Sequence, residues 1–454
     1  MSDTLLCETV KRTSTPLGAI PSLDEKAKPW DYLDSWRMIL AGIMLAVLEN
    51  RLDSNRNEFI DKIRFLNQTS LWTELQIYSA LQSLCCKLLE LPIPKSTFFQ
   101  HPNGSAPLEF GGHWAWAEVP LLRYHAELGM LWAFLGHMEK AEKLADWQLN
   151  ALDHSFYPFV GLFSQESDGS LNRLLASQYL LFHSVAVLAN RPDLEYIASR
   201  QLEHLKQLPN SEATPFELMC EAWIQQKKVE QQQIRLPKKI CDSENSLVGS
   251  RTSDYSVVCS LAGGGTGLGA LHKQGLQLVN YGPHRLPLGE CQGFGIGSGR
   301  NIALEVLENG FTIQGTVPLA SKAILPTRFP LFRVGAPSQN WLDIKQSFFQ
   351  EVLTIDTHFL GENIESLAFA FFVKAEQCSV GKEQVKPFSF QRYSGNVQPV
   401  RLEGQQCRLD LITDSSCHEM QVIPLSGGEN FWGASFLIAY ILNSSCERYR
   451  WQVL

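Results

Sequence analysis

The spacing of hydrophobic positions changes once along this chain, near residue 240. From Trp30 to about Gln233, apolar residues recur every three or four positions, which predicts amphipathic helices. After Tyr255 come short runs in which apolar and polar residues alternate, with Gly, Pro and Asn between them, which is typical of antiparallel strands. Helices and strands that are segregated in sequence do not interleave into one parallel sheet. The sequence therefore predicts a helical domain followed by a β domain.

The helical domain is expected at residues 29–235, after a polar arm at 1–28 that contains prolines and that we interpret as flexible. Roughly eight helices joined in pairs by short turns predict helical hairpins, which can close into an α/α toroid-like domain. An open array of helical repeats is the alternative. It is the weaker one, because no second copy of a hairpin follows at a fixed period.

A linker is expected at residues 236–254, and the β domain at 255–454. About a dozen short strands are predicted there, which is too many for one twisted sheet. The strands are therefore expected to form a large antiparallel β-sandwich, in which two sheets pack face to face. No long amphipathic pattern interrupts this part of the sequence.

Charge and composition exclude some functions. The formal net charge is −8, and a nucleic-acid binder needs a clustered basic surface, so we expect no nucleic-acid partner. The longest apolar stretch, Met38–Leu48, is too short to cross a bilayer, and residues 1–22 contain no apolar signal-peptide core. The chain has eleven cysteines but no CxxC pair, which favours free core thiols in a reducing compartment. A cytoplasmic location without membrane contact is the resulting expectation.

The richest group of candidate binding residues lies around residue 113. His113, Trp114 and Trp116 come just before a predicted helix, where they could project into a cleft, and Arg123 and Tyr124 follow about two turns later. The alternative is that both tryptophans fill the core and that His113 caps the helix. His125, on an apolar helix face, is expected to be a core histidine.

Two further groups are candidates. Tyr157 belongs to a loop, His154-Ser155-Phe156-Tyr157, between two predicted helices, and the alternative there is an ordinary loop with a buried Phe-Tyr pair. His284 and Arg285 follow a predicted strand, where Arg285 could meet an anionic sugar or form a salt bridge between domains. No zinc-protease, Walker A, EF-hand or nucleophile-elbow motif is present, and the glycine-rich run at 263–269 opens no predicted helix. We expect neither a metal nor a cofactor.

The order of elements over about 30–450 resembles the heparinase II/III-like polysaccharide lyases, which join an α/α toroid to an antiparallel β-sandwich. The local match is Ala262-Gly263-Gly264-Gly265-Thr266-Gly267-Leu268-Gly269-Ala270 leading into Leu276–Pro283, at the position of that family's first sandwich hairpin. The family's hairpin typically carries a His-x-His-x-Asp cluster. This sequence departs from it and has only His272 nearby.

The resemblance implies a carbohydrate-active or carbohydrate-binding protein with an acidic polysaccharide in an interdomain cleft. If it is an enzyme, the resemblance implies β-elimination, with His113, Tyr124 or Tyr157 as base or acid and Arg123 or Arg285 on the substrate carboxylate. Trp114, Trp116 and His284 would then contact the sugar. The competing hypothesis is a non-catalytic interaction or scaffold protein with the same fold, which could have a protein partner.

Overall fold

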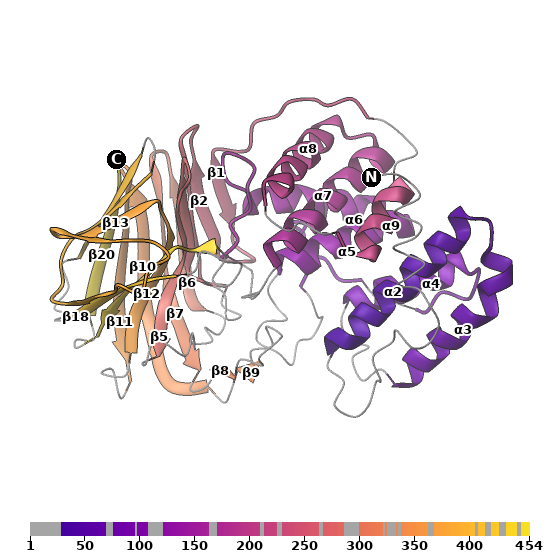
Figure 1. Cartoon of the computed structure of the whole chain (residues 1–454), viewed down its shortest axis with the longest axis horizontal. Helices are drawn as coiled ribbons and strands as arrows, with labels where there is room; N and C mark the ends of the chain where they lie inside the picture. Colours follow the sequence, from indigo (N-terminus) through magenta and orange to yellow (C-terminus); the bar gives the residue numbers. More distant parts are fainter. Residues whose placement is uncertain are drawn as a thin grey trace. The chain divides into compact units, whose positions relative to one another are not determined.

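The computed structural model describes residues 29–69, 76–95, 98–107, 121–162, 170–208, 213–224, 229–262, 267–285, 299–320, 323–324, 333–334, 337–361, 367–404, 407–413, 419–425, 433–442 and 446–454. The chain forms two compact units, one built of helices and one built of strands (Figure 1). The predicted order, helices first and antiparallel strands second, is confirmed. Within the described residues, no helix combines the length and the hydrophobicity that a membrane crossing requires.

Helices of the first unit follow the apolar spacing of the sequence. Their bounds are α2 Pro29–Leu48, α3 Leu52–Thr69, α4 Gln76–Leu88, α5 Leu122–Leu135, α6 Met138–Gln148 with a 3₁₀ turn η1 at Leu149–Ala151, α7 Ser170–Ala189, α8 Pro192–Gln207 and α9 Pro215–Ile224. Prolines occupy the first position of α8 and of α9, where a backbone N–H is not needed. Neighbouring helices contact one another as α2–α3, α2–α4, α4–α5 and α5–α6, and α2 also contacts α9. The first described helix therefore meets the last.

In the second unit the described strands form two large antiparallel sheets. The first has the order β1-β2-β3-β4-β5-β12-β19-β18-β15, with bounds Lys239–Asp242, Leu247–Arg251, Tyr255–Ser260, Gly269–Lys273, Leu276–Arg285, Leu367–Lys374, Phe436–Ile441, Glu419–Pro424 and Tyr393–Gly395. The second has the order β14-β13-β16-β17-β20-β11-β10-β7-β6, with bounds Glu383–Val385, Gln377–Val380, Val400–Glu403, Arg408–Thr413, Cys446–Val453, Val352–Leu360, Pro337–Phe349, Gly310–Ala320 and Arg300–Leu307. A short pair, β8 Ala323–Ile324 and β9 Arg333–Val334, is separate from both.

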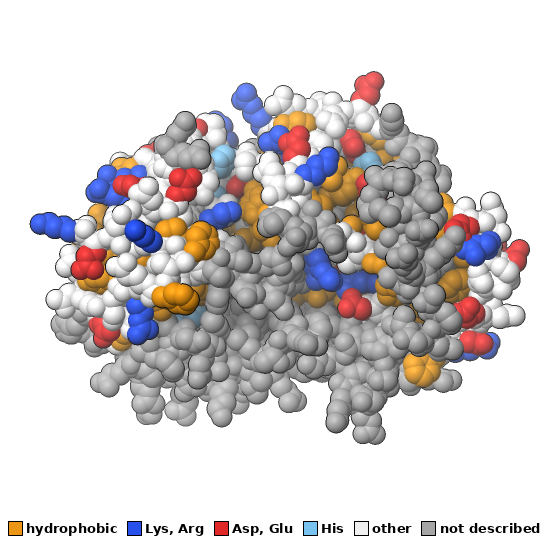
Figure 2. All heavy atoms as spheres, in the orientation of Figure 1, with side chains coloured by type: hydrophobic (Ala, Val, Ile, Leu, Met, Phe, Trp, Pro, Cys, Tyr) orange, Lys and Arg blue, Asp and Glu red, His pale blue; other side chains and the backbone are white. Residues whose placement is uncertain are grey.

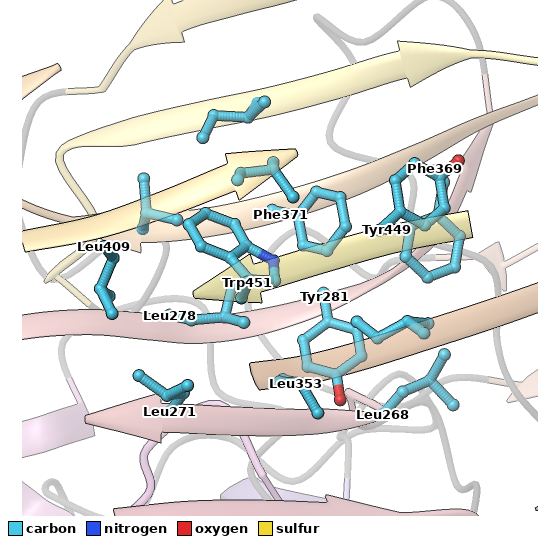
Figure 3. Close-up of a cluster of buried hydrophobic side chains, with 14 of the residues drawn as sticks. Leu268, Leu271, Leu278, Tyr281, Leu353, Phe369, Phe371, Leu409, Tyr449 and Trp451 are labelled. Atoms are coloured by element: carbon cyan, nitrogen blue, oxygen red, sulfur yellow. The ribbon is translucent and has the colours of Figure 1, made fainter. Parts of the chain in front are cut away.

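One hydrophobic core lies between these two sheets (Figure 3). Phe369 and Phe371 of β12 in the first sheet contact Tyr449 and Trp451 of β20 in the second, with the Phe369 and Tyr449 rings stacked at 4.8 Å. Because side chains alternate along a strand, the residues between these positions point away from the core. The core therefore fixes which side chains each sheet presents on its outer face.

Two sequence expectations about the domain boundary need correction. The segment 236–254, expected to be a linker, contains β1 and β2, which extend the first sheet and bury Ile240, Leu247 and Val248. Segment Asn150–Leu171, expected in the helical domain, belongs to the strand unit. The first strands are short and flanked by polar residues, so their alternation is too brief to stand out from a linker.

The aromatic contacts in the core predict a large loss of stability on truncation. Phe371 is fully buried and touches Tyr281, Tyr440, Tyr449 and Trp451, so Phe371→Ala should lower the free energy of unfolding by about 3–5 kcal/mol. Denaturant unfolding of the parent and the variant measures this difference. Phe390→Ala is the control, because Phe390 is fully exposed and its loss should change stability by less than about 0.5 kcal/mol. Similar losses from both substitutions would contradict the core assignment.

Candidate functional site

A pocket of about 220 Å³ lies inside the helical unit. It is lined by α2, α5, α7 and the start of α9, and its polar lining residues are Asp34, Arg37, Arg123, Glu127, Arg173, Ser177, Thr214 and Glu217. Three arginines and three carboxylates thus share one small volume. The hydrogen bonds of each group decide which charges remain for a ligand.

Arg37 is the most buried of the three arginines. Its Nε and Nη2 atoms donate to the two carboxylate oxygens of Glu127 at 2.7 and 2.6 Å, and Nη1 donates to Asp34 at 2.7 Å. Burial opposes the charge on this guanidinium, but Glu127 outweighs that effect and raises the pKa of Arg37 well above its usual value. The ion pair between Arg37 and Glu127 joins α2 to α5. Together with its bond to Asp34, Arg37 engages two of the three carboxylates of the pocket.

Glu217 is occupied in a different way. Its carboxylate accepts a hydrogen bond from the backbone N–H of Thr214 at 2.7 Å, and the Thr214 hydroxyl accepts one from the N–H of Glu217 at 3.2 Å. This reciprocal arrangement is a capping box, which stabilises the first turn of α9. The positive end of the α9 dipole therefore lies at the pocket, and Glu217 already compensates part of it.

Arg173 is the exposed cation of the pocket. It lies at the end of the first turn of α7 and forms no hydrogen bond or ion pair with any residue the structure describes. The three arginines and three carboxylates of the lining sum to zero charge, but Glu127, Asp34 and Glu217 already accept hydrogen bonds within the protein. The cation of Arg173 is therefore the charged group most open to a ligand. Arrangements of this kind bind a carboxylate or another small anion.

Two residues that the sequence nominated are brought together here. Arg123 lines the pocket, and its guanidinium carbon lies 5.4 Å from the centre of the Tyr124 ring; the guanidinium carbon of Arg37 lies 5.9 Å from the same centre. Tyr124 is buried and is not among the described lining residues, so it supports two guanidinium groups as a cation–π partner. Arg37 and Glu127 were missed, because nothing in the sequence indicates that α2 and α5 converge.

His125, next to Tyr124, is a core residue, as expected. It is buried, its Nε2 accepts a hydrogen bond from the Ala106 backbone N–H at 3.1 Å, and its Nδ1 lies 2.9 Å from Nε2 of Gln148. Burial lowers the pKa of His125 to about 3. The imidazole is therefore neutral at physiological pH and does not act as a cation in the pocket.

A second cluster lies under the loop 152–162 of the strand unit. The Asp153 carboxylate accepts hydrogen bonds from the backbone N–H and hydroxyl of Ser155 at 2.8 and 2.7 Å, and from the Tyr157 N–H at 2.9 Å. Its other oxygen lies 2.9 Å from Nδ1 of His272 on β4. Burial would raise the pKa of Asp153, but the bonds to His272 and Ser155 outweigh it and lower the pKa to about 2. Asp153 is thus an ionised anchor for the loop.

Tyr157 lies beside this anchor. Its ring centre is 6.3 Å from that of His272, and the Phe159 ring is 4.9 Å from the same imidazole. Burial, together with the nearby Asp153 charge, raises the pKa of the Tyr157 phenol, so the hydroxyl stays protonated at neutral pH. These contacts favour a structural role for Tyr157. That role agrees with the alternative interpretation from the sequence, an ordinary loop with a buried Phe-Tyr pair.

The remaining nominated residues do not join these clusters within the described structure. His284 on β5 packs its ring 5.3 Å from Phe372, and burial lowers its pKa. Arg285 pairs through its backbone with Leu367 of β12, and its side chain lies outside the description. His113, Trp114 and Trp116 lie outside the described residues altogether. Of the described residues, no group of three or more His, Cys, Asp or Glu side chains could hold a metal ion.

No protein-family model matches this sequence, and no curated protein matches it either. Among solved structures, a chondroitin AC lyase mutant from Streptomyces coelicolor A3 is similar over 100% of this chain and 71% of its own, with 10% identity and a TM-score of 0.44. A 4-alpha-glucanotransferase from Thermococcus litoralis covers 77% and 60% at 11% identity and a TM-score of 0.32. A putative mutarotase from Salmonella typhimurium covers 47% and 92% at 9% identity and 0.31. TM-scores below 0.5 do not define a shared fold.

The pKa of His125 predicts how the helical unit responds to acid. Because the folded pKa is about 3 and the unfolded value is about 6.5, the unfolded chain takes up a proton that the folded chain refuses as pH falls from 6.5 to 3. Stability from this group is complete above pH 6.5 and should decline below it by up to about 1.4 kcal/mol per pH unit. The melting temperature as a function of pH measures this, and His125→Gln should reduce the slope. An unchanged slope in that variant would refute the assignment.

The Asp153 anchor predicts that the loop loosens when its charge is removed. Asp153→Asn leaves one carbonyl oxygen for several donors, so it should destabilise the unit by about 3–5 kcal/mol. Hydrogen exchange at the Ser155 and Tyr157 amides should speed up. Asp254→Asn, at the exposed turn between β2 and β3, is the control and should leave both amides protected. Equal protection in Asp153→Asn and the parent would disprove the anchor.

Proposed function

We propose that this protein binds a carboxylate-bearing sugar, a uronate unit of an acidic oligosaccharide or polysaccharide, in the pocket of the helical unit. The observation that carries the proposal is the state of the charges there. Asp34 and Glu127 are paired with Arg37, Glu217 caps α9, and Arg173 is exposed at the pocket without a described partner. An incoming carboxylate would meet Arg173, Arg123 and the positive end of α9.

The dimensions of the pocket support a small occupant. Its volume of about 220 Å³ is below the range of roughly 300–1,000 Å³ that is typical of sites for drug-sized ligands. A pocket of this volume suits one sugar unit, at the end or on a side group of a longer chain, better than it suits several consecutive units of a polymer. Hydroxyl groups of the sugar would find partners in Ser177 and in the ends of the arginines.

We also propose that the helical hairpins close as an α/α toroid-like ring around this pocket. Support comes from the contact between α2 and α9 and from the pocket lining, which draws on helices from both ends of the unit. In such a ring the acidic ligand would enter at the end where the helix termini converge. The N-terminus of α9 lies at the pocket and would be part of that entrance.

Binding without catalysis is the form of the proposal that the described side chains favour. β-Elimination needs a base near the sugar, and Tyr157 is a buried phenol whose pKa is raised. Tyr124 is buried beneath two guanidinium groups. Lyase activity would then depend on His113, with Trp114 and Trp116 as sugar-stacking partners, and is the second candidate function.

The test is a thermal-shift measurement with glucuronate and galacturonate against glucose and galactose as neutral controls. A ligand of the native state raises the melting temperature, and a hundredfold excess over Kd corresponds to about 2.7 kcal/mol. The uronates should stabilise the parent and should bind Arg173→Gln at least tenfold more weakly, because a charge-assisted hydrogen bond is lost. At the same ligand concentration, the stabilisation of that variant should fall to about 1.4 kcal/mol or less. Arg64→Gln, an exposed arginine of α3 outside the pocket, is the matched control and should respond like the parent.

Equal stabilisation by neutral sugars, or a full response of Arg173→Gln, would contradict the proposal. Incubation with uronate-containing polysaccharides separates the two candidate functions. New ultraviolet absorbance from an unsaturated uronate would establish elimination, whereas a thermal shift without it would establish binding alone.

A further inference from the structure

The outer face of the second sheet contains a groove that the helical pocket does not explain. It has a volume of about 750 Å³ and is lined by side chains of β6, β7, β10, β11 and β20. The side chains that point outward there are polar, because the alternate residues of the same strands fill the core. From this groove we propose a second ligand site, for a neutral sugar.

The strand register arranges these side chains in two rows across the sheet. In the first row, Asp343 on β10 lies between Thr316 on β7 and His358 on β11. In the second row, Lys345 lies between Gln314 and Asp356, and Asp356 is opposite Arg448 on β20. Acceptors and donors therefore alternate along and across the strands.

Each of the two outward-pointing aspartates of the groove uses one oxygen within the protein. The Thr316 hydroxyl donates to Oδ1 of Asp343 at 2.5 Å, and Nε of Arg448 donates to Oδ1 of Asp356. Among the described residues, Oδ2 of neither aspartate accepts a hydrogen bond. The two aspartates are diagonal neighbours on adjacent strands, which separates their Cβ atoms by about 7–8 Å. Hydroxyl groups on different carbons of one sugar ring can reach both.

The charge of the groove favours a neutral ligand over an acidic one. The outward-pointing Asp343 and Asp356 balance Lys345 and Arg448, so a uronate or phosphate would meet no net positive charge. A sugar diol instead donates to a carboxylate and accepts from an adjacent Lys, Arg or Gln.

An aromatic side chain stands next to the groove on the same face. Trp341 precedes Asp343 by two positions on β10, so both point outward, and its ring is half-buried. The guanidinium carbon of Arg300 on β6 lies 5.0 Å from the centre of that ring. Apolar faces of sugar rings stack on such platforms, while the hydroxyl edges turn to the polar rows.

The experiment is isothermal titration calorimetry of the full chain with cellobiose, maltose and lactose. At least one disaccharide should bind the parent, and Asp343→Asn, which keeps the shape of the side chain, should weaken that binding about 10- to 100-fold. Trp341→Ala should weaken it about tenfold. Ser347→Ala, farther along the outer face of β10 and outside the groove, is the control and should bind like the parent.

Absence of binding by all three disaccharides, or equal binding by the parent, Asp343→Asn and Trp341→Ala, would overturn the proposal. Arg173→Gln distinguishes the two sites. Retention of disaccharide binding in that variant supports the groove, and loss of it would place the disaccharide in the helical pocket and refute the groove. If the uronates do not bind the helical pocket, the disaccharide experiment still tests the groove, because the two sites share no residue.

Discussion

A charge removed from water must find a partner, and this constraint shapes both units of the molecule. In the helical unit, the buried guanidinium of Arg37 is held by Glu127 and Asp34, which ties α2 to α5. In the strand unit, the buried carboxylate of Asp153 is held by His272 and by the turn that follows it. Each pairing satisfies one buried charge and determines which neighbouring groups remain open. A ligand can therefore interact only with the polar side chains that these buried pairings do not engage.

How much of the fold the sequence could predict depends on how many residues each hydrophobic pattern covers. Helices such as α5 and α7 repeat their apolar spacing over several turns, so their existence and position were predictable. β1 and β2 are 4 and 5 residues long, which gives alternation little room to appear. Membership of Asn150–Leu171 in the strand unit was not predictable, because no local pattern reveals which partner a loop will contact.

The candidate site shows the same limit more sharply. Arg123 and Tyr124 were predictable as a pair because they are adjacent and follow the aromatic segment His113-Trp114-Ala115-Trp116. Glu127 lies one turn away on the same helix, but its partner Arg37 is 90 residues earlier. Asp153 and His272 are 119 residues apart, and no spacing rule connects them. The capping box of Thr214 and Glu217 was readable in principle as Thr-Pro-Phe-Glu, a recognised helix-start signature.

The glycines near residue 267 have a packing explanation. A Cβ atom at Gly269 would come within 2.4 Å of the Tyr281 hydroxyl and 2.5 Å of the Val258 carbonyl oxygen. A Cβ atom at Gly267 would meet the side-chain amide of Asn280. At these two positions, glycine allows β3, β4 and β5 to approach closely. Gly267 and Gly269 are therefore explained by the close packing of the sheet itself.

The distance along the chain between Asp153 and His272 also has a consequence for synthesis. The loop that carries Asp153 leaves the ribosome 119 residues before its histidine partner. At typical translation rates this interval lasts roughly 6–24 s. During that time the aromatic side chains of Tyr157 and Phe159 have no β4 to cover them, although α5 and α6 are already complete. The nascent chain therefore exposes these two aromatic rings until β4 has been synthesised.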